Sequence, residues 1–442
     1  MKYFLPTIGI VAASALFAFS TSSERAIAVE KSSQEKTFEQ LDLFADVLAR
    51  VRNDYVVPVD NADLIDDALN GMLQGLDPHS SYINPDRFSD LQISTSGEYG
   101  GLGMEVTMED GAVKVVAPID ETPAKKAGIL SGDYLTAIDG ESILGLGLND
   151  AVDRLRGKPG EPITITVIRK GEDPMDIEMV REVIKPLVVR HRIEDGVGYL
   201  RISQFNEKTS GSLDKAIKAI LSETNKKVPG LIIDLRGNPG GLLEQSIKVS
   251  STFLDGGEVV STRGRHAQDT ERYNAKRGER LKDVPIIVLI DGASASASEI
   301  VAGALQDRGR ALIVGLTSFG KGSVQSVIPL RNGRDGALRL TTARYYTPAG
   351  RSIQGTGITP DIAISYAHDD GKGNIGRISE SDLPNSIKNE QAKLKAESEE
   401  EIEQTVEYPP KDFDVENDFQ LKRAVEILKN GSYKTLLAEA KG

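Results

Sequence analysis

The feature that most constrains the fold is an apolar strand that leads, through a turn of very small residues, into a helix. The strand is predicted from Pro285 to Ile290, where five successive aliphatic residues follow the proline. Such an uninterrupted run is typical of a strand that is buried on both faces, as in a parallel sheet. Residues 292–298 are only Gly, Ala and Ser, and a helix is predicted from Ser296 to Gln306.

The same order of strand and then helix recurs along the chain on both sides of this unit. Further strands are predicted at residues 198–205, 231–235 and 311–315, and further helices at 212–222 and 242–253. This alternation predicts an α/β layer around a largely parallel sheet. Beyond it, residues 326–364 are predicted to form hairpins with turns at Asn332-Gly333 and Asp335-Gly336.

Composition and periodicity divide the chain into five regions after its first segment. Residues 35–95 carry two apolar stripes at helical spacing, and these helices need the rest of the chain or a second copy as a partner. Residues 96–183 have short alternating runs punctuated by glycine, which predict a compact β-rich module. The α/β core occupies residues 184–366. Residues 367–418 are predicted to be a charged, solvated linker without chemistry, and residues 419–442 a helical segment that docks.

The first 28 residues have the pattern of an export signal. One lysine precedes an apolar run to Phe19, and Ala26-Ile27-Ala28 is a small-x-small site for cleavage after Ala28. An uncleaved anchor is the alternative, because an apolar run of about 17 residues is at the short limit of a membrane span. We expect an exported protein, in the periplasm or on the periplasmic face of the inner membrane, and leave cleavage open.

Composition excludes several kinds of site and partner. Among the 442 residues there is no cysteine, so disulfides, cysteine nucleophiles and Cys-ligated metal clusters are impossible. The histidines are far apart in the sequence and form no metal-binding motif, so we expect no metal and no other cofactor; they are His79, His191, His266 and His368. The net charge of −13 argues against a nucleic-acid partner, which requires a basic surface.

The small-residue turn is the first segment that could carry chemistry. It places serine hydroxyls, including that of Ser296, and free backbone N–H groups at a helix N-terminus, where an activated hydroxyl or an anion site can lie. Taken alone, a serine that only caps the helix is the better supported interpretation. Glu299 has the position of a capping partner. Asp307 is about 16 Å further along the helix, so a structural role is expected for it.

The second segment runs from Gly315 to Gln325 and contains one lysine. Its first seven residues fit G-x-x-x-x-G-K, but Gly322 stands where a nucleotide-binding loop needs Ser or Thr, so nucleotide binding ranks lower. A serine needs a base, and burial can lower the pKa of a lysine from about 10.4, so we consider Ser296 and Lys321 as one site. An ordinary surface lysine is the alternative. Gln325 can orient the amine only if the chain turns there, since four residues of straight strand span about 13 Å.

The third segment is the turn from Asp234 to Leu242, which contains Pro239-Gly240-Gly241. A strand end, this turn and a helix start expose backbone N–H groups, as an oxyanion hole requires. From this segment alone, a tight strand-to-helix connection is the better supported interpretation.

Together, the three segments strongly resemble the carboxyl-terminal processing peptidases, also called tail-specific proteases. The resemblance is carried by Asp-Leu-Arg-Gly-Asn-Pro-Gly-Gly at 234–241, Ser-Ala-Ser-Ala-Ser-Glu at 294–299 and Phe-Gly-Lys-Gly-Ser-Val-Gln at 319–325. The spacing of serine to lysine (321 − 296 = 25) and of lysine to glutamine (325 − 321 = 4) agrees with that family. It covers the chain from about Phe38 to Ser365.

The resemblance implies a fold and a set of site residues. The fold is a ClpP/crotonase-like α/β core, with a PDZ domain inserted between it and a helical N-terminal region. Gly100, Gly101, Leu102 and Gly103 look like the PDZ loop whose backbone N–H groups bind a terminal carboxylate. By position, Ser296 is the nucleophile, Lys321 the general base and Gln325 the residue that orients it. The oxyanion hole uses Ala297 and either Gly240 or Gly241, a choice that stays open.

The function implied is that of a serine endopeptidase that cleaves proteins near their C-termini. Its PDZ domain is expected to recognise apolar, exposed C-terminal tails of protein substrates, and Ser296 and Lys321 to form a Ser–Lys dyad. Homo-oligomerisation through the terminal helices and binding of an adaptor protein are left open. The alternative is a non-catalytic PDZ scaffold or adaptor in which the serine and lysine are structural.

Overall fold

The structure is a computed structural model that describes residues 36–109, 111–368, 378–389, 391 and 405–441. The predicted export signal at residues 1–28 lies outside the described residues. No helix within the described ranges is long and apolar enough to cross a membrane. The chain divides into two compact units, one that ends at Met72 and one that begins at Leu73.

The first unit is helical. A helix spans residues 36–54, and α2 (Asn61–Gln74) begins in this unit and ends just beyond its boundary. The Asp60 carboxylate accepts hydrogen bonds from the backbone N–H groups of Ala62 and Asp63 and so caps α2. Large apolar side chains of the first helix are exposed, namely Phe38, Leu41, Leu43, Phe44 and Val47.

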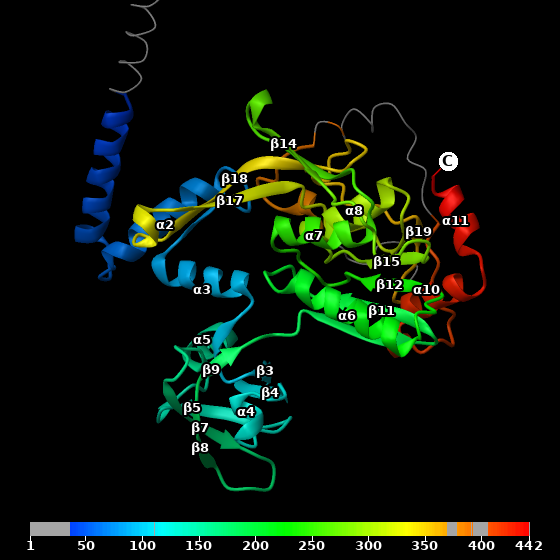
Figure 1. The fold of residues 1–442 in the computed structure, drawn as a ribbon. Helices are drawn as coiled ribbons and strands as arrows, with labels where there is room; N and C mark the ends of the chain where they lie inside the picture. The colour runs from blue at the N-terminus through cyan, green and yellow to red at the C-terminus, as the bar shows by residue number, and fades with distance from the viewer. Residues whose placement is uncertain (1–35, 110, 369–377, 390, 392–404, 442) are drawn as a thin grey trace, which may run out of the picture. The chain divides into compact units, whose positions relative to one another are not determined.

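The core of the second unit is a six-stranded sheet (Figure 1). Its order is β10 (Val189–Glu194), β11 (Val197–Ile202), β12 (Leu231–Asp234), β15 (Ile286–Ile290), β16 (Leu312–Gly315) and β19 (Ile362–Ala363). Only the β10–β11 pair is antiparallel, and the other neighbours are parallel. All five residues of β15 are fully buried, as the uninterrupted apolar run predicts.

Helices cover both faces of this sheet (Figure 1). One face packs against α6 (Thr209–Glu223), α7 (Leu243–Phe253) and α8 (Ala297–Asp307), and the other against α10 (Phe419–Lys429) and α11 (Tyr433–Glu439). Because side chains alternate along a strand, Leu231 and Ile233 join the first cluster and Ile232 joins the second. The predicted docking helix is α10, and its apolar side chains fill the second cluster.

A second, antiparallel sheet lies at the end of the core that carries the candidate site residues. It contains β1 (Ser81–Ile83), β13 (Glu258–Arg263), β14 (Thr270–Asn274), β17 (Ser323–Pro329) and β18 (Ala337–Tyr346). β17 and β18 form one long hairpin, and β1 pairs with β18. The sequence predicted several hairpins over residues 326–364; both predicted turns fall within the single connection at 330–336.

Residues 96–183 form the predicted β-rich module. Its sheet is β3 (Met104–Glu109), β4 (Ala112–Pro118), β5 (Tyr134–Ile138), β6 (Glu141–Ser142), β7 (Pro162–Ile168) and β8 (Met175–Val180), with α4 (Pro123–Lys126) and α5 (Leu148–Leu155). The module has a hydrophobic core of its own. The chain enters and leaves it through the antiparallel pair β2 (Tyr99–Gly101) and β9 (Glu182–Ile184). The predicted class, an α/β core with an inserted β-rich domain and a helical N-terminal region, is confirmed.

The predicted linker is not solvated throughout. Within residues 378–389, Glu380 is fully buried and its backbone N–H donates to the carbonyl of Phe319. Asn389 donates to the carbonyl of Gln354 at 2.8 Å. The expectation of a solvated linker is therefore wrong for this segment. The polar composition of this segment predicts solvation. The prediction fails because composition does not reveal that these polar groups have hydrogen-bond partners in the core.

Candidate active site

Ser296 lies in a strained backbone conformation at the start of α8. Its φ and ψ are 53° and −112°, a combination that L-residues rarely adopt. The turn before it is fixed by Asp291, whose Oδ1 accepts N–H bonds from Ala293 and Ser294 at 3.0 Å each. The Ser294 hydroxyl in turn donates to the Leu235 carbonyl at 2.9 Å. Strain of this kind persists only where the surroundings over-determine the conformation, and it is common at functional sites.

The Ser296 turn opens onto a cavity of about 500 Å³. Lys321, Gln325 and Gly241 line the same cavity, together with apolar surface that includes Phe205. The structure therefore brings together the predicted nucleophile, base and orienting residue, and one of the two candidate oxyanion glycines. A cavity of this size can accept several side chains of an extended peptide or a small ligand.

Lys321 lies in the loop between β16 and β17, and its side chain is largely removed from water. Burial lowers the pKa of its ammonium below the ordinary value, and the positive charge of Arg339 acts in the same direction. Carboxylates at Glu380, Glu299 and Asp77 oppose this shift. Among the described residues, no side chain forms an ion pair or hydrogen bond with the Lys321 Nζ. A desolvated lysine of this kind can exist as the neutral amine that a general base requires.

Glu299 joins the serine turn to the lysine loop. One carboxylate oxygen accepts from the Ser318 hydroxyl at 2.6 Å and the Gly320 N–H at 2.7 Å. The other accepts from the N–H groups of Ser296 at 2.7 Å and Lys321 at 2.9 Å. The predicted capping role is confirmed, but the carboxylate also fixes the second segment. Burial raises the pKa of Glu299 to about 7, although all four hydrogen bonds act to lower it.

Gln325 lies on β17, just after a register shift between Val324 and Gln325. Its amide nitrogen donates to the Ser323 hydroxyl at 2.9 Å and the Thr341 hydroxyl at 3.2 Å. Within the part of the chain that the structure describes, it makes no hydrogen bond with Lys321. The side chain thus lines the cavity with its amide nitrogen bonded to Ser323 and Thr341.

The two candidate oxyanion glycines have different surroundings. The Gly240 N–H donates to the Asn238 side-chain oxygen at 2.9 Å. A Cβ on Gly240 would lie 2.9 Å from the Ala297 nitrogen, so the glycine turn and the start of α8 are in close contact. Gly241 lines the cavity, and its φ of 139° and close approach to the Phe205 carbonyl exclude a side chain. Of the two glycines, Gly240 has an N–H that is already satisfied within its own turn, by Asn238.

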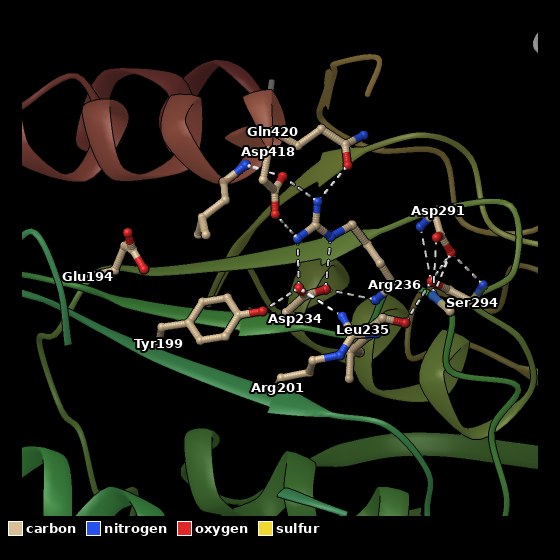
Figure 2. A network of polar contacts seen from close by, with 12 residues as sticks. Glu194, Tyr199, Arg201, Asp234, Leu235, Arg236, Asp291, Ser294, Asp418 and Gln420 are labelled. Atoms are coloured by element: carbon tan, nitrogen blue, oxygen red, sulfur yellow. Dashed lines mark hydrogen bonds and ion pairs between the residues drawn. The ribbon is translucent and has the colours of Figure 1, made fainter. Parts of the chain in front are cut away.

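The strand end that leads into this turn is held by a buried ionic network (Figure 2). Asp234 accepts hydrogen bonds from Arg236 and from the Tyr199 hydroxyl, both at 2.7 Å. Arg236 also donates to Asp418, at 2.7 and 2.8 Å, and to Gln420 at 3.0 Å, at the start of α10. Burial alone would raise the pKa of Asp234, but the bonds and charge of Arg236 hold it below its ordinary value. The C-terminal helix and the glycine turn are thus tied together.

The predicted PDZ loop does not line the cavity. Gly100 and Gly101 belong to β2, whereas Leu102 is buried in the core of the module. Gly103 has a φ of 76°, and a Cβ there would lie 2.4 Å from the Thr122 side chain, so the loop depends on glycine. In the described part of the sheet, β3 pairs with β4 alone, which leaves one strand edge unpaired. Such an edge can accept an added peptide strand.

Sequence reasoning missed a polar cluster beside Lys321. Asp77 accepts from the Thr341 hydroxyl at 3.0 Å and from the Ser80 hydroxyl at 2.7 Å. His79 Nε2 lies 2.8 Å from a carboxylate oxygen of the buried Glu380. The available signal was the polar run Asp77-Pro78-His79-Ser80 between a helix and a strand, but nothing in its spacing indicates which distant residues it meets.

Comparisons with known proteins match three regions of the chain. Residues 196–364 match the model of peptidase family S41, residues 114–169 match a PDZ domain, and residues 8–87 match the N-terminal domain of the activating protease CtpB. The chain is 50% identical to a carboxy-terminal-processing protease of Bartonella bacilliformis over 404 residues, 91% of each chain. It is 33% identical to the carboxy-terminal processing protease CtpA of Bacillus subtilis over 363 residues, 81% of this chain and 76% of that one.

The solved structures that resemble this chain include the photosystem II D1 C-terminal processing protease. That protein is 30% identical, with a TM-score of 0.44 and coverage of 70% of this chain and 84% of its own.

Proposed function

Because the chain belongs to peptidase family S41 and is a carboxy-terminal-processing serine protease with a PDZ domain, we propose that Ser296 and Lys321 are its catalytic dyad. The observation that carries the proposal is the shared cavity, which Ser296 and the largely desolvated Lys321 both line. Ser296 supplies a hydroxyl nucleophile and Lys321 an amine with a lowered pKa, the two groups that acyl transfer needs where no histidine of the described residues lines the cavity.

The dyad would work through an acyl-enzyme. The Ser296 Oγ attacks the peptide carbonyl while Lys321 Nζ takes the hydroxyl proton, and the lysine then gives this proton to the leaving amine. Water hydrolyses the ester in the second half of the reaction. The N–H groups of Ala297 and Gly241 are our choice for the oxyanion hole, because the Gly240 N–H already donates to Asn238.

Gln325 would orient the Lys321 amine after a rotation of its side chain. Its amide nitrogen now donates to Ser323 and Thr341, so the rotation exchanges these bonds for one with the lysine. We expect Gln325→Ala to reduce the rate less than loss of the serine or the lysine, because orientation supports proton transfer without carrying it.

Substrate selection is assigned to the PDZ domain. We propose that an exposed, apolar C-terminal tail adds as a strand along the free edge of β3, with its carboxylate on the loop formed by Gly100, Gly101, Leu102 and Gly103. The exposed apolar side chains of the 36–54 helix support a proposal of homo-oligomerisation or adaptor binding. Action outside the cytoplasm is proposed from the sequence pattern of residues 1–28.

Cleavage of a substrate with an apolar C-terminal tail tests the dyad. Ser296→Ala and Lys321→Ala should each abolish cleavage while tail binding, measured by fluorescence anisotropy, is unchanged. Ser222→Ala and Lys248→Ala, at exposed helical positions, are the matched controls and should retain full activity. Near wild-type cleavage by either dyad variant would refute the proposal.

A further inference from the structure

Glu380 is a fully buried carboxylate that the proposed mechanism does not use. It lies at the start of a short 3-10 helix, Glu380–Asp382, beyond the residues that match the peptidase family model. Carboxylates are very seldom fully buried without a partner, so its contacts define what it does.

Its carboxylate has two side-chain partners. Both oxygens lie close to His79 Nε2, at 3.0 and 2.8 Å, and one of them also accepts from the Gln354 amide at 3.0 Å. Its backbone N–H donates to the Phe319 carbonyl, two residues before Lys321. Glu380 therefore connects the segment before β1 with the loop that carries the lysine.

Gln354 extends this connection to the residue after Lys321. Its side-chain oxygen accepts from the Gly322 N–H at 3.0 Å, and the next residue, Gly355, donates to the Gly320 carbonyl at 2.8 Å. A Cβ on Gly322 would lie 2.3 Å from the Gln354 nitrogen, so the two backbones are in direct contact. Both glycines that flank Lys321 are thus held by Gln354, which donates to Glu380, and by its neighbour Gly355.

We infer that Glu380 is a positioning residue for the lysine: through its backbone N–H and through Gln354 it holds the Lys321 loop, and His79 fixes its carboxylate. This inference rests on the proposed Ser–Lys dyad. Glu380 does not act on substrate; it acts through Lys321.

The charges around Lys321 determine the direction in which its pKa should move when one of them is removed. Glu380, Glu299 and Asp77 each raise the pKa of Lys321, and Arg339 and burial lower it. Glu380 is hydrogen-bonded to His79, and its charge is the largest of those that raise the pKa of Lys321. Removal of the Glu380 carboxylate should therefore move the lysine titration to lower pH.

The test is the pH dependence of kcat/KM for a tailed peptide, measured on the full chain. In Glu380→Gln the rising limb should move to lower pH by about 0.5 to 1 unit, because a carboxylate that favours the ammonium is lost. In His79→Gln, whose amide can still donate to Glu380, the carboxylate is kept, so the limb should move less than in Glu380→Gln. Glu380→Ala, which also loses the Gln354 contact, should lower kcat/KM by about 10²-fold.

Asp382→Asn is the matched control. Asp382 is exposed and accepts hydrogen bonds from the backbone and side chain of Ser379, so its loss disturbs the segment without removing the Glu380 charge. The rising limb of the pH profile of Asp382→Asn should coincide with that of the wild type. A limb that stays in place in Glu380→Gln, whatever the change in rate, would show a purely structural role and overturn the inference.

The result is separable from the dyad proposal and from misfolding. An active Lys321→Ala would refute the dyad, whereas an inactive Lys321→Ala with unshifted limbs would refute only the role of Glu380. If Glu380→Gln fails to fold, titration of the ¹³C-labelled Lys321 ε-methylene in Ser296→Ala is compared with and without Gln354→Ala, which removes the link from Glu380 to the Gly322 N–H. A shifted midpoint in the Gln354→Ala background supports the inference, and an equal midpoint overturns it.

Discussion

Two fully buried carboxylates, Asp234 and Glu299, hold different segments of the site and differ in what surrounds them. Asp234 forms ion pairs with Arg236 and Arg201. Glu299 accepts from one hydroxyl and three backbone N–H groups, and among the described residues no cationic side chain pairs with it. The pKa of Asp234 is lowered, whereas burial raises the pKa of Glu299 to about 7.

The difference shows how similar burial produces an anchor at one place and a titratable group at another. A guanidinium compensates a buried carboxylate, so the charge of Asp234 is fixed over the physiological pH range. Neutral donors compensate Glu299 only in part, and it titrates near neutrality. The anchored side holds the turn at Gly240 and Gly241, where the oxyanion hole is proposed, and the titratable side connects Ser296 with Lys321, where proton transfer is proposed.

The largest effect on stability is expected from removal of Arg236, the cation that pairs with the buried Asp234. Arg236→Met leaves Asp234 with one partly exposed guanidinium and should cost about 3–5 kcal/mol of the free energy of unfolding. Urea denaturation followed by circular dichroism measures the loss. The control is Arg201→Met, whose side chain is 39% exposed, and which should cost about 1 kcal/mol. Equal losses in the two variants would contradict the role of Arg236.

Removal of the Glu299 charge should have a smaller effect on stability. Glu299→Gln turns an amide group toward two N–H or hydroxyl donors, so we expect a loss of about 1–3 kcal/mol and a lower kcat. Glu244→Gln, on the exposed first turn of α7, is the matched control and should be within about 0.5 kcal/mol of the wild type. A variant with wild-type stability and rate would show that Glu299 does not hold the two segments together.

The pH dependence of stability separates the two carboxylates by sign. The folded-state pKa of Glu299 is raised above its ordinary 4.5, so its contribution is fully present below that value and is lost as the pH rises through about 7. The pKa of Asp234 is lowered, so its contribution is present above its ordinary 3.8 and is lost in acid. The drop in urea midpoint between pH 5 and pH 8 should therefore be smaller in Glu299→Gln than in the wild type. An equal fall in both proteins would contradict this assignment.

The smallest effect on stability is expected at Asp418, the partly exposed partner of Arg236. Asp418→Asn keeps a side-chain oxygen for the α10 cap but removes a charge that is 34% exposed, so we expect a loss of about 1 kcal/mol. Hydrogen exchange should become faster in α10. Glu416→Gln, exposed and two residues away, should leave exchange unchanged. Faster exchange in the control alone would place the attachment of α10 elsewhere.

The sequence predicts local segments well because their patterns are local. The run of five aliphatic residues and the small-residue turn are enough to predict β15 and α8, and the structure has them at Ile286–Ile290 and Ala297–Asp307. The structural role predicted for Asp307 is confirmed by its ion pair with Arg351. These predictions depend on periodicity and on reach along one helix, both of which a single sequence contains.

Contacts between distant segments could not be predicted. His79 and Glu380 are 301 residues apart, and Arg236 and Asp418 are 182 apart, with no spacing rule to join them. Glu380 lies in a stretch whose polar composition favours a solvated chain, so its burial becomes visible only when its partners are placed. The choice between Gly240 and Gly241 likewise depends on one hydrogen bond, from Gly240 to Asn238.

The most direct test of the Ser–Lys assignment is the rate at which a fluorophosphonate labels the protein in the presence of a bound tail peptide. The wild type should carry one label, located at Ser296 by peptide mapping, and Ser296→Ala should carry none. Lys321→Ala should label about 10²- to 10⁴-fold more slowly, because the hydroxyl has lost its base. A label at another residue, or wild-type labelling of Ser296 in Lys321→Ala, would contradict the account.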